Sequence, residues 1–99
     1  MNIVQQALAG TLESSDILIR IGPNSQNIVT VELHSSVKKQ FGEEIEATIR
    51  NTLESMGVTQ AHVVVDDKGA LDCVIKARVQ AAALRASDET DNLNWSQLS

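Results

Sequence analysis

The first third of the chain alternates between apolar and polar positions with a period near two. Residues 7–12 and 17–21 form two such runs, and a third covers residues 29–34. A period of two places every second side chain on the same face of a strand. The pattern therefore predicts three strands. The first two should form a hairpin whose tip is the short polar segment 13–16, and we expect this tip to be exposed and mobile.

From Ser36 onward the apolar positions recur every three or four residues, which is the period of a helix. This stripe predicts a helix over residues 36–56, with Ser35 or Ser36 as its N-cap and Gly57 as a left-handed C-cap. A second helix is expected over about residues 70–86. Its composition is apolar on almost all sides, so we expect it to be deeply buried.

A short β-branched segment, residues 61–65, lies between the two helices and predicts a fourth strand, ended by a turn at 66–69. The element order is then β-β-β-α-β-α. This order predicts an α+β fold, with a small, mostly antiparallel sheet and two helices packed on one face. Residues 1–88 would form this domain, and the polar, acidic residues 89–99 are expected to be a flexible tail.

Charge and composition narrow the classes of function. Lys and Arg number eight against thirteen Asp and Glu, a net charge of -5, and only Phe41 and Trp95 are aromatic. Nucleic-acid binding requires clustered cations and often aromatic platforms, so nucleic acid is not an expected partner. No apolar run approaches the about 20 residues of a membrane helix, and the N-terminus lacks a signal-peptide pattern. We expect a soluble, cytoplasmic protein with no membrane partner.

No group of residues has the pattern of a catalytic or metal centre. His34 and His62 fall on different predicted strands, and the pair 66–67 fits a turn and helix cap better than a cation site. The lone Cys73 lies in the apolar second helix, where we expect a buried thiol. Trp95 is either incidental or an anchor for a partner. The residues thus predict neither an enzyme nor a bound metal.

Four stretches of the chain nevertheless resemble a known family, the acyl carrier (γ) subunits of citrate lyase. They are Ala9–Asp16, Ile19–Ile21, Val37–Gly42, and Val65–Cys73 with the following Ala77–Arg78. In that family the serine of the Gly-Thr-Leu-Glu-Ser segment carries a covalently attached phosphoribosyl dephospho-coenzyme A group. The resemblance assigns this role to Ser14. Family members often have glycine at the next position, where this chain has Ser15.

The resemblance implies a non-catalytic carrier. The thiol of the attached group would bear acetyl and citryl groups while citrate is cleaved to acetate and oxaloacetate. The implied partners are the α (acyl transferase) and β (lyase) subunits of citrate lyase, with a prosthetic-group transferase and an acetate ligase as transient partners. Because the cofactor supplies the sulfur, the protein needs no reactive cysteine.

Two alternatives stay open. One is the acyl carrier subunit of malonate decarboxylase, which is similar in size and carries the same type of arm; the bound acyl group, acetyl or malonyl, separates the two. The other is a regulatory or scaffold domain with an unmodified serine, which the intact mass of the protein from citrate-grown cells would reveal. From the residues alone, Ser14 is an ordinary turn residue.

Overall fold

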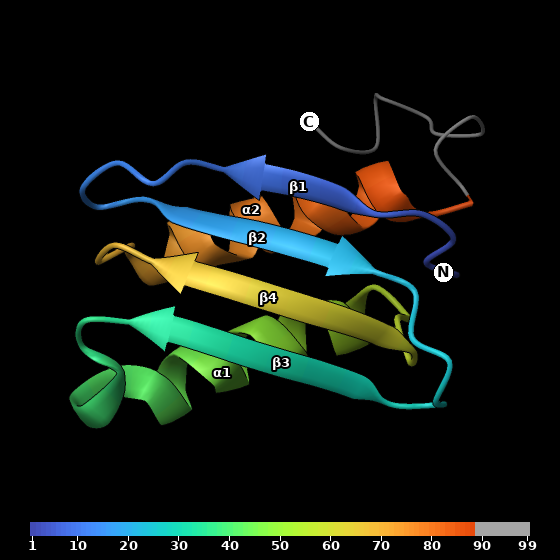
Figure 1. Cartoon of the computed structure of the whole chain (residues 1–99), viewed down its shortest axis with the longest axis horizontal. Helices are drawn as coiled ribbons and strands as arrows, with labels where there is room; N and C mark the ends of the chain where they lie inside the picture. The colour runs from blue at the N-terminus through green and yellow to red at the C-terminus, as the bar shows by residue number, and fades with distance from the viewer. Residues whose placement is uncertain (89–99) are drawn as a thin grey trace.

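The computed structural model describes residues 1–88 of the chain, so the predicted tail and Trp95 lie outside the described residues. The elements follow the predicted order β-β-β-α-β-α. Their bounds are β1 Ala7–Gly10, β2 Ile17–Gly22, β3 Val29–Ser35, α1 Lys38–Ser55, β4 Ala61–Asp67 and α2 Asp72–Ala86. Figure 1 shows one sheet with both helices behind it, which confirms the α+β prediction.

The four strands form a mixed sheet in the order β1-β2-β4-β3. Strand β2 pairs antiparallel with both β1 and β4, whereas β3 pairs parallel with β4. The parallel pair arises because α1 carries the chain back across one face of the sheet before β4 begins, so both strands run in the same direction. The sheet is therefore mostly antiparallel, as predicted, with one parallel pairing at the β3 edge.

The core lies between the sheet and the two helices. Strand β4 buries every second side chain, β2 buries its three isoleucines and also Leu18 between them, and each helix buries one stripe. The buried residues between the layers include Ile17, Ile19 and Ile21 of β2, Ala61, Val63 and Val65 of β4, Ile45, Ile49 and Leu53 of α1, and Ile75, Val79, Ala82, Ala83 and Ala86 of α2. The three buried alanines allow α2 to lie close to the sheet.

Helix α2 differs from its prediction. It begins at Asp72, and only one side of it is buried. Leu71, just before the helix, is 70% exposed, and Cys73 in the first turn is exposed as well, so the expectation of a buried thiol is wrong. In a two-layer fold a helix has one face toward the sheet, whatever the composition of its other faces. Neither helix of the described chain is long and apolar enough to span a bilayer.

Helix α1 ends as predicted but begins differently. Gly57 follows the last turn at φ +75°, and the amides of Gly57 and Val58 donate back to carbonyl oxygens of that turn, which is a glycine-closed helix end. At the start, the N-cap is Val37 and has no side-chain cap. The predicted serine cap is wrong because Ser35 is the last residue of β3, where its hydroxyl donates to Asp67 at 2.9 Å.

Candidate functional site

The candidate serine lies at the tip of the β1–β2 hairpin, at one end of the sheet (Figure 1). Strand β1 ends at Gly10 rather than at residue 12, because Gly10 takes φ +96° and turns the chain out of the strand. The Glu13 carbonyl accepts the Asp16 amide at 3.1 Å, which closes a turn around Ser14. Ser14 is exposed, as predicted, and its hydroxyl has no hydrogen-bond partner among residues 1–88.

Ser15 has a left-handed backbone, at φ +67°, unlike every other non-glycine residue in the described part of the chain. Its amide donates to the Lys68 carbonyl at 2.8 Å, so a contact with the loop after β4 holds this conformation. A side chain in this region costs roughly 1–2 kcal/mol because Cβ approaches a carbonyl oxygen. Glycine avoids that cost, which explains physically why a glycine would suit the position where this chain has serine.

We expect Ser15→Gly to stabilise the protein by up to about 1 kcal/mol. This net gain is the strain energy relieved in the folded state minus the entropic cost of glycine's greater freedom in the unfolded chain. Urea unfolding followed by circular dichroism measures the change. Ser25→Gly is the matched control, because Ser25 is an exposed loop serine without positive φ, and it should show no gain. Equal gains at both positions would contradict the argument.

Asp16 ties the hairpin tip to α2. Arg78 donates from Nε to Oδ1 at 3.1 Å and from Nη2 to Oδ2 at 2.9 Å, a paired geometry that suits a guanidinium and a carboxylate. The same carboxylate accepts the Thr11 hydroxyl and the Ile17 amide, each at 2.7 Å. The Arg78 bonds, followed by those from Thr11 and Ile17, hold the pKa of Asp16 well below its usual range.

This depressed pKa gives a testable pH dependence. The native bonds to ionised Asp16 stabilise the fold fully above about pH 4, the unfolded pKa, and that stabilisation is lost as pH falls toward the lower native pKa. Asp16→Asn should therefore destabilise the protein at pH 7 and progressively less below about pH 4. Chemical denaturation of both proteins at pH 7 and pH 3 checks this. An unchanged difference at the two pH values would refute it, and Glu13→Gln, at an exposed position in the same turn, is the control.

A second loop is paired with the tip. The Lys68 amide donates to the Asp16 carbonyl at 2.9 Å, next to the bond from Ser15 to the Lys68 carbonyl. The loop after β4 thus lies against the second half of the tip, while the Lys68 side chain is exposed. These backbone bonds, with those of Asp16 to Arg78, anchor the second half of the tip, and the mobility of the tip stays a prediction that amide hydrogen exchange tests.

Asp66 and Asp67 end β4 and do not form the predicted turn. Asp67 is 2% exposed, and besides the Ser35 hydroxyl it accepts the Ala70 amide at 3.0 Å. It therefore stabilises the connection into α2, although the N-cap of that helix, Leu71, has no side-chain cap. Within residues 1–88 no group of three or more His, Cys, Asp or Glu is arranged to hold a metal ion.

The two histidines do not form a site together. His62 of β4 lies 2.6 Å from the Thr30 hydroxyl through Nδ1, and His34 of β3 lies 3.6 Å from Glu32. Both histidines are exposed. Each contacts a polar side chain on β3, as expected of ordinary strand residues.

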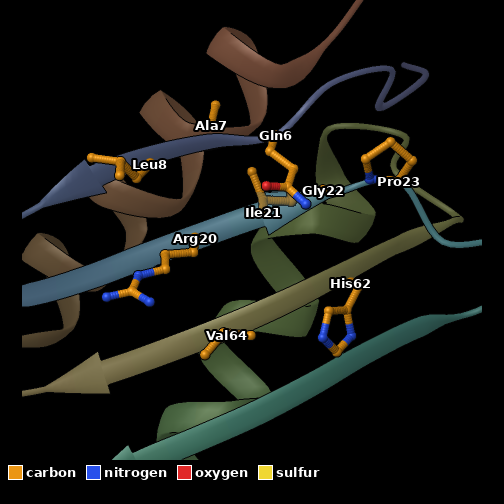
Figure 2. Close-up of a pocket in the computed structure, with 9 residues that line it drawn as sticks. All are labelled: Gln6, Ala7, Leu8, Arg20, Ile21, Gly22, Pro23, His62 and Val64. Carbon is orange, nitrogen blue, oxygen red and sulfur yellow. The ribbon is translucent and has the colours of Figure 1, made fainter.

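A hollow of about 410 Å³ lies on the sheet face away from the helices, toward the end opposite Ser14 (Figure 2). Its lining mixes apolar side chains with one arginine and one histidine. The residues are Gln6, Ala7, Leu8, Arg20, Ile21, Gly22, Pro23, His62 and Val64. Sequence reasoning missed this hollow because strands β1, β2 and β4 contribute its lining together. No cysteine, serine or carboxylate is among these lining residues.

Comparison with known proteins establishes the class. A sequence model of the family described as "ACP: Malonate decarboxylase delta subunit" matches residues 4–86. The fold is similar to that of a chain in the crystal structure of a Pseudomonas malonate decarboxylase hetero-tetramer in complex with malonate. The TM-score is 0.71 and the identity 17%, and the match covers 88% of this chain and 93% of that one. The protein is thus an acyl carrier subunit of the α+β kind.

Relatives of higher identity narrow the family. The citrate lyase acyl carrier protein of Klebsiella pneumoniae subsp. pneumoniae is 60% identical over 98 residues, which cover 99% of this chain and 100% of the relative. Citrate lyase acyl carrier protein 2 of Salmonella typhimurium is 58% identical over the same length and coverage. The citrate lyase acyl carrier protein of Haemophilus influenzae is 57% identical over 95 residues, which cover 96% of each chain. The chain belongs to the citrate lyase acyl carrier proteins, which confirms the resemblance and the prediction of a non-catalytic carrier.

Proposed function

We propose that this chain serves citrate lyase by carrying a phosphoribosyl dephospho-coenzyme A group on the hydroxyl oxygen of Ser14. Two observations support the proposal: the exposure of that hydroxyl, and the 60% identity of the chain to a citrate lyase acyl carrier protein. The hydroxyl is exposed and without a hydrogen-bond partner among residues 1–88, at the tip of a hairpin whose neighbouring residues are bonded. A bulky group fits there because no part of it needs to enter the core.

Attachment requires a donor in which the group is activated, and a ribosyl triphosphate is a donor class that balances the reaction. The Ser14 oxygen forms a bond to phosphorus, the bond from phosphorus to a diphosphate leaving group breaks, and the hydroxyl proton passes to solvent or to a base of the transferase. Ser14 is afterwards a phosphodiester anchor. The attached group supplies a thiol that bears acyl groups during the cleavage of citrate to acetate and oxaloacetate.

Covalent anchoring explains why a carrier without catalytic residues is useful. A tethered thiol stays at high effective concentration near each active site that it reaches and never has to rebind from solution. The proposed stable partners are the α and β subunits of citrate lyase in the cytoplasm, with a prosthetic-group transferase and an acetate ligase as transient partners. The malonate decarboxylase carrier is only a distant relative, since its likeness rests on 17% identity, so we propose citrate lyase.

Intact-mass analysis of the protein from citrate-grown cells tests the proposal. We expect a mass increase equal to the phosphoribosyl dephospho-coenzyme A group, located on the peptide that contains Ser14. Ser14→Ala should remove the increase and Ser15→Ala should keep it. An unmodified native chain, or the group on another residue, would overturn the proposal.

A further inference from the structure

The residues on both sides of Ser14 are fixed by hydrogen bonds, whereas the Ser14 hydroxyl is not. On one side, the Thr11 hydroxyl oxygen accepts the Glu13 amide at 3.1 Å. On the other, Ser15 is bonded to the Lys68 carbonyl, and Asp16 closes the turn to Glu13. The exposed serine is thus held between two bonded neighbours, which fix the backbone around it and leave its hydroxyl unbonded.

Arg78 is the side chain that links this tip to the helix layer. It lies 62 positions from Asp16 in sequence, and its guanidinium supplies two of the four donors to the Asp16 side chain. The other two, Thr11 and Ile17, belong to the hairpin itself. Asp16 is 14% exposed and Arg78 40%, so the ion pair is partly shielded from water and is less screened than a fully exposed pair.

The other cationic side chains of α2 that make contacts are directed elsewhere. Lys76 lies 3.2 Å from Asp72 within the same helix. Arg85 donates to the Leu8 carbonyl of β1 at 2.8 Å, away from the tip. Arg85 therefore also joins α2 to the hairpin, but by one bond to a backbone carbonyl and without touching the serine turn. This difference between two arginines supplies a matched control.

We infer that Arg78 is a positioning residue for the attachment of the prosthetic group: by holding Asp16, it keeps the Ser14 turn in the shape that the transferase binds. The inference rests on the proposed function. If the tip were disordered, the transferase would have to order it on binding. The apparent affinity for the carrier would then be reduced in proportion to the fraction of chains in the competent shape. Once bound, the hydroxyl would react at the usual rate, because Arg78 acts through Asp16 and not on the reacting atoms.

The test compares unmodified native chain, Arg78→Met and Arg85→Met as substrates of the transferase with its ribosyl triphosphate donor, followed by intact mass. Methionine keeps an unbranched apolar stem and removes the paired donors. If Arg78→Met leaves about a tenth of chains in the competent shape, KM for the carrier rises about tenfold while kcat and the KM for the donor stay unchanged. Arg85→Met should have the native constants.

A native KM in folded Arg78→Met, or a fall in kcat at constant KM, would overturn the inference. Should Arg78→Met not fold, Arg78→Lys keeps the charge without the paired geometry and should raise the carrier KM by a smaller factor; native constants there would equally overturn it. Hydrogen exchange gives an independent readout: residues 13–16 should exchange faster in the variant, and unchanged exchange would contradict the inference. If the native chain is not modified at Ser14, the proposed function fails instead.

Discussion

Citrate cleavage by the reconstituted complex should fall to background when Ser14 is replaced by alanine, with the fold unchanged. The Ser14 hydroxyl is exposed and unbonded among the described residues, so its removal should alter the free energy of unfolding by no more than about 0.5 kcal/mol. The same change removes the proposed anchor of the thiol. Rates of oxaloacetate formation with purified α and β subunits, together with a thermal unfolding curve, measure both effects.

Ser15→Ala is the control for this experiment because it removes a hydroxyl one residue away. It should retain modification and most of the activity, since the bond that fixes this residue comes from its backbone amide. Activity retained by Ser14→Ala would show that the anchor lies elsewhere. Loss of the fold in Ser14→Ala would show that the turn hydroxyl has a structural role that its contacts do not indicate.

Gly10→Ala should be among the most destabilising single substitutions in the hairpin. A Cβ at this position would overlap the Ile17 carbonyl oxygen and lie 2.9 Å from its carbonyl carbon, and the backbone has φ +96°. The left-handed conformation costs roughly 1–2 kcal/mol and overpacking about 1–3 kcal/mol, so we expect a loss of roughly 2–5 kcal/mol. This is a large part of the total for a small domain, about 5–15 kcal/mol, and urea unfolding measures it.

Gly69→Ala separates the two contributions. Gly69 has a similar φ, +90°, but a Cβ added there would meet no atom within 4 Å. Only the conformational cost of roughly 1–2 kcal/mol should then be lost. Equal losses at Gly10 and Gly69 would mean that the contact with Ile17 is relieved by a small shift of the hairpin and that the close approach of the two strands is not a constraint.

The elements of the fold could be predicted from sequence because each depends on a local period. The period of two in residues 17–21 and the helical stripe of residues 36–56 reflect burial on one face, which any packed arrangement requires. The place of β4 between β2 and β3 could not be predicted in this way, because it depends on how α1 crosses the sheet. The exposure of Cys73 was missed because the apolar composition of the second helix was given more weight than its polar positions: Asp72, Lys76 and Gln80 recur every four residues on the exposed side, next to Cys73.

The site was predictable only in part. From its own residues Ser14 is one hydroxyl in a polar turn, and the family resemblance selected it. The contact between Asp16 and Arg78 joins positions 62 residues apart, and no spacing rule brings them together. The available signal was Arg78 itself, a charged residue of the second helix. Such a residue needs either water or a partner, and the structure provides Asp16.

The anchored tip has a geometric consequence for the assembly. Bonds to Arg78 and Lys68 tie the turn to α2 and to the loop after β4, so on the proposed function we expect the position of Ser14 to be fixed relative to the sheet. All changes of direction would then arise from bond rotations within the attached group. Every active site that the thiol enters must then lie within the length of the attached group from Ser14, on the side toward which this end of the sheet is directed. The carrier would thereby restrict how the larger subunits can be placed around it.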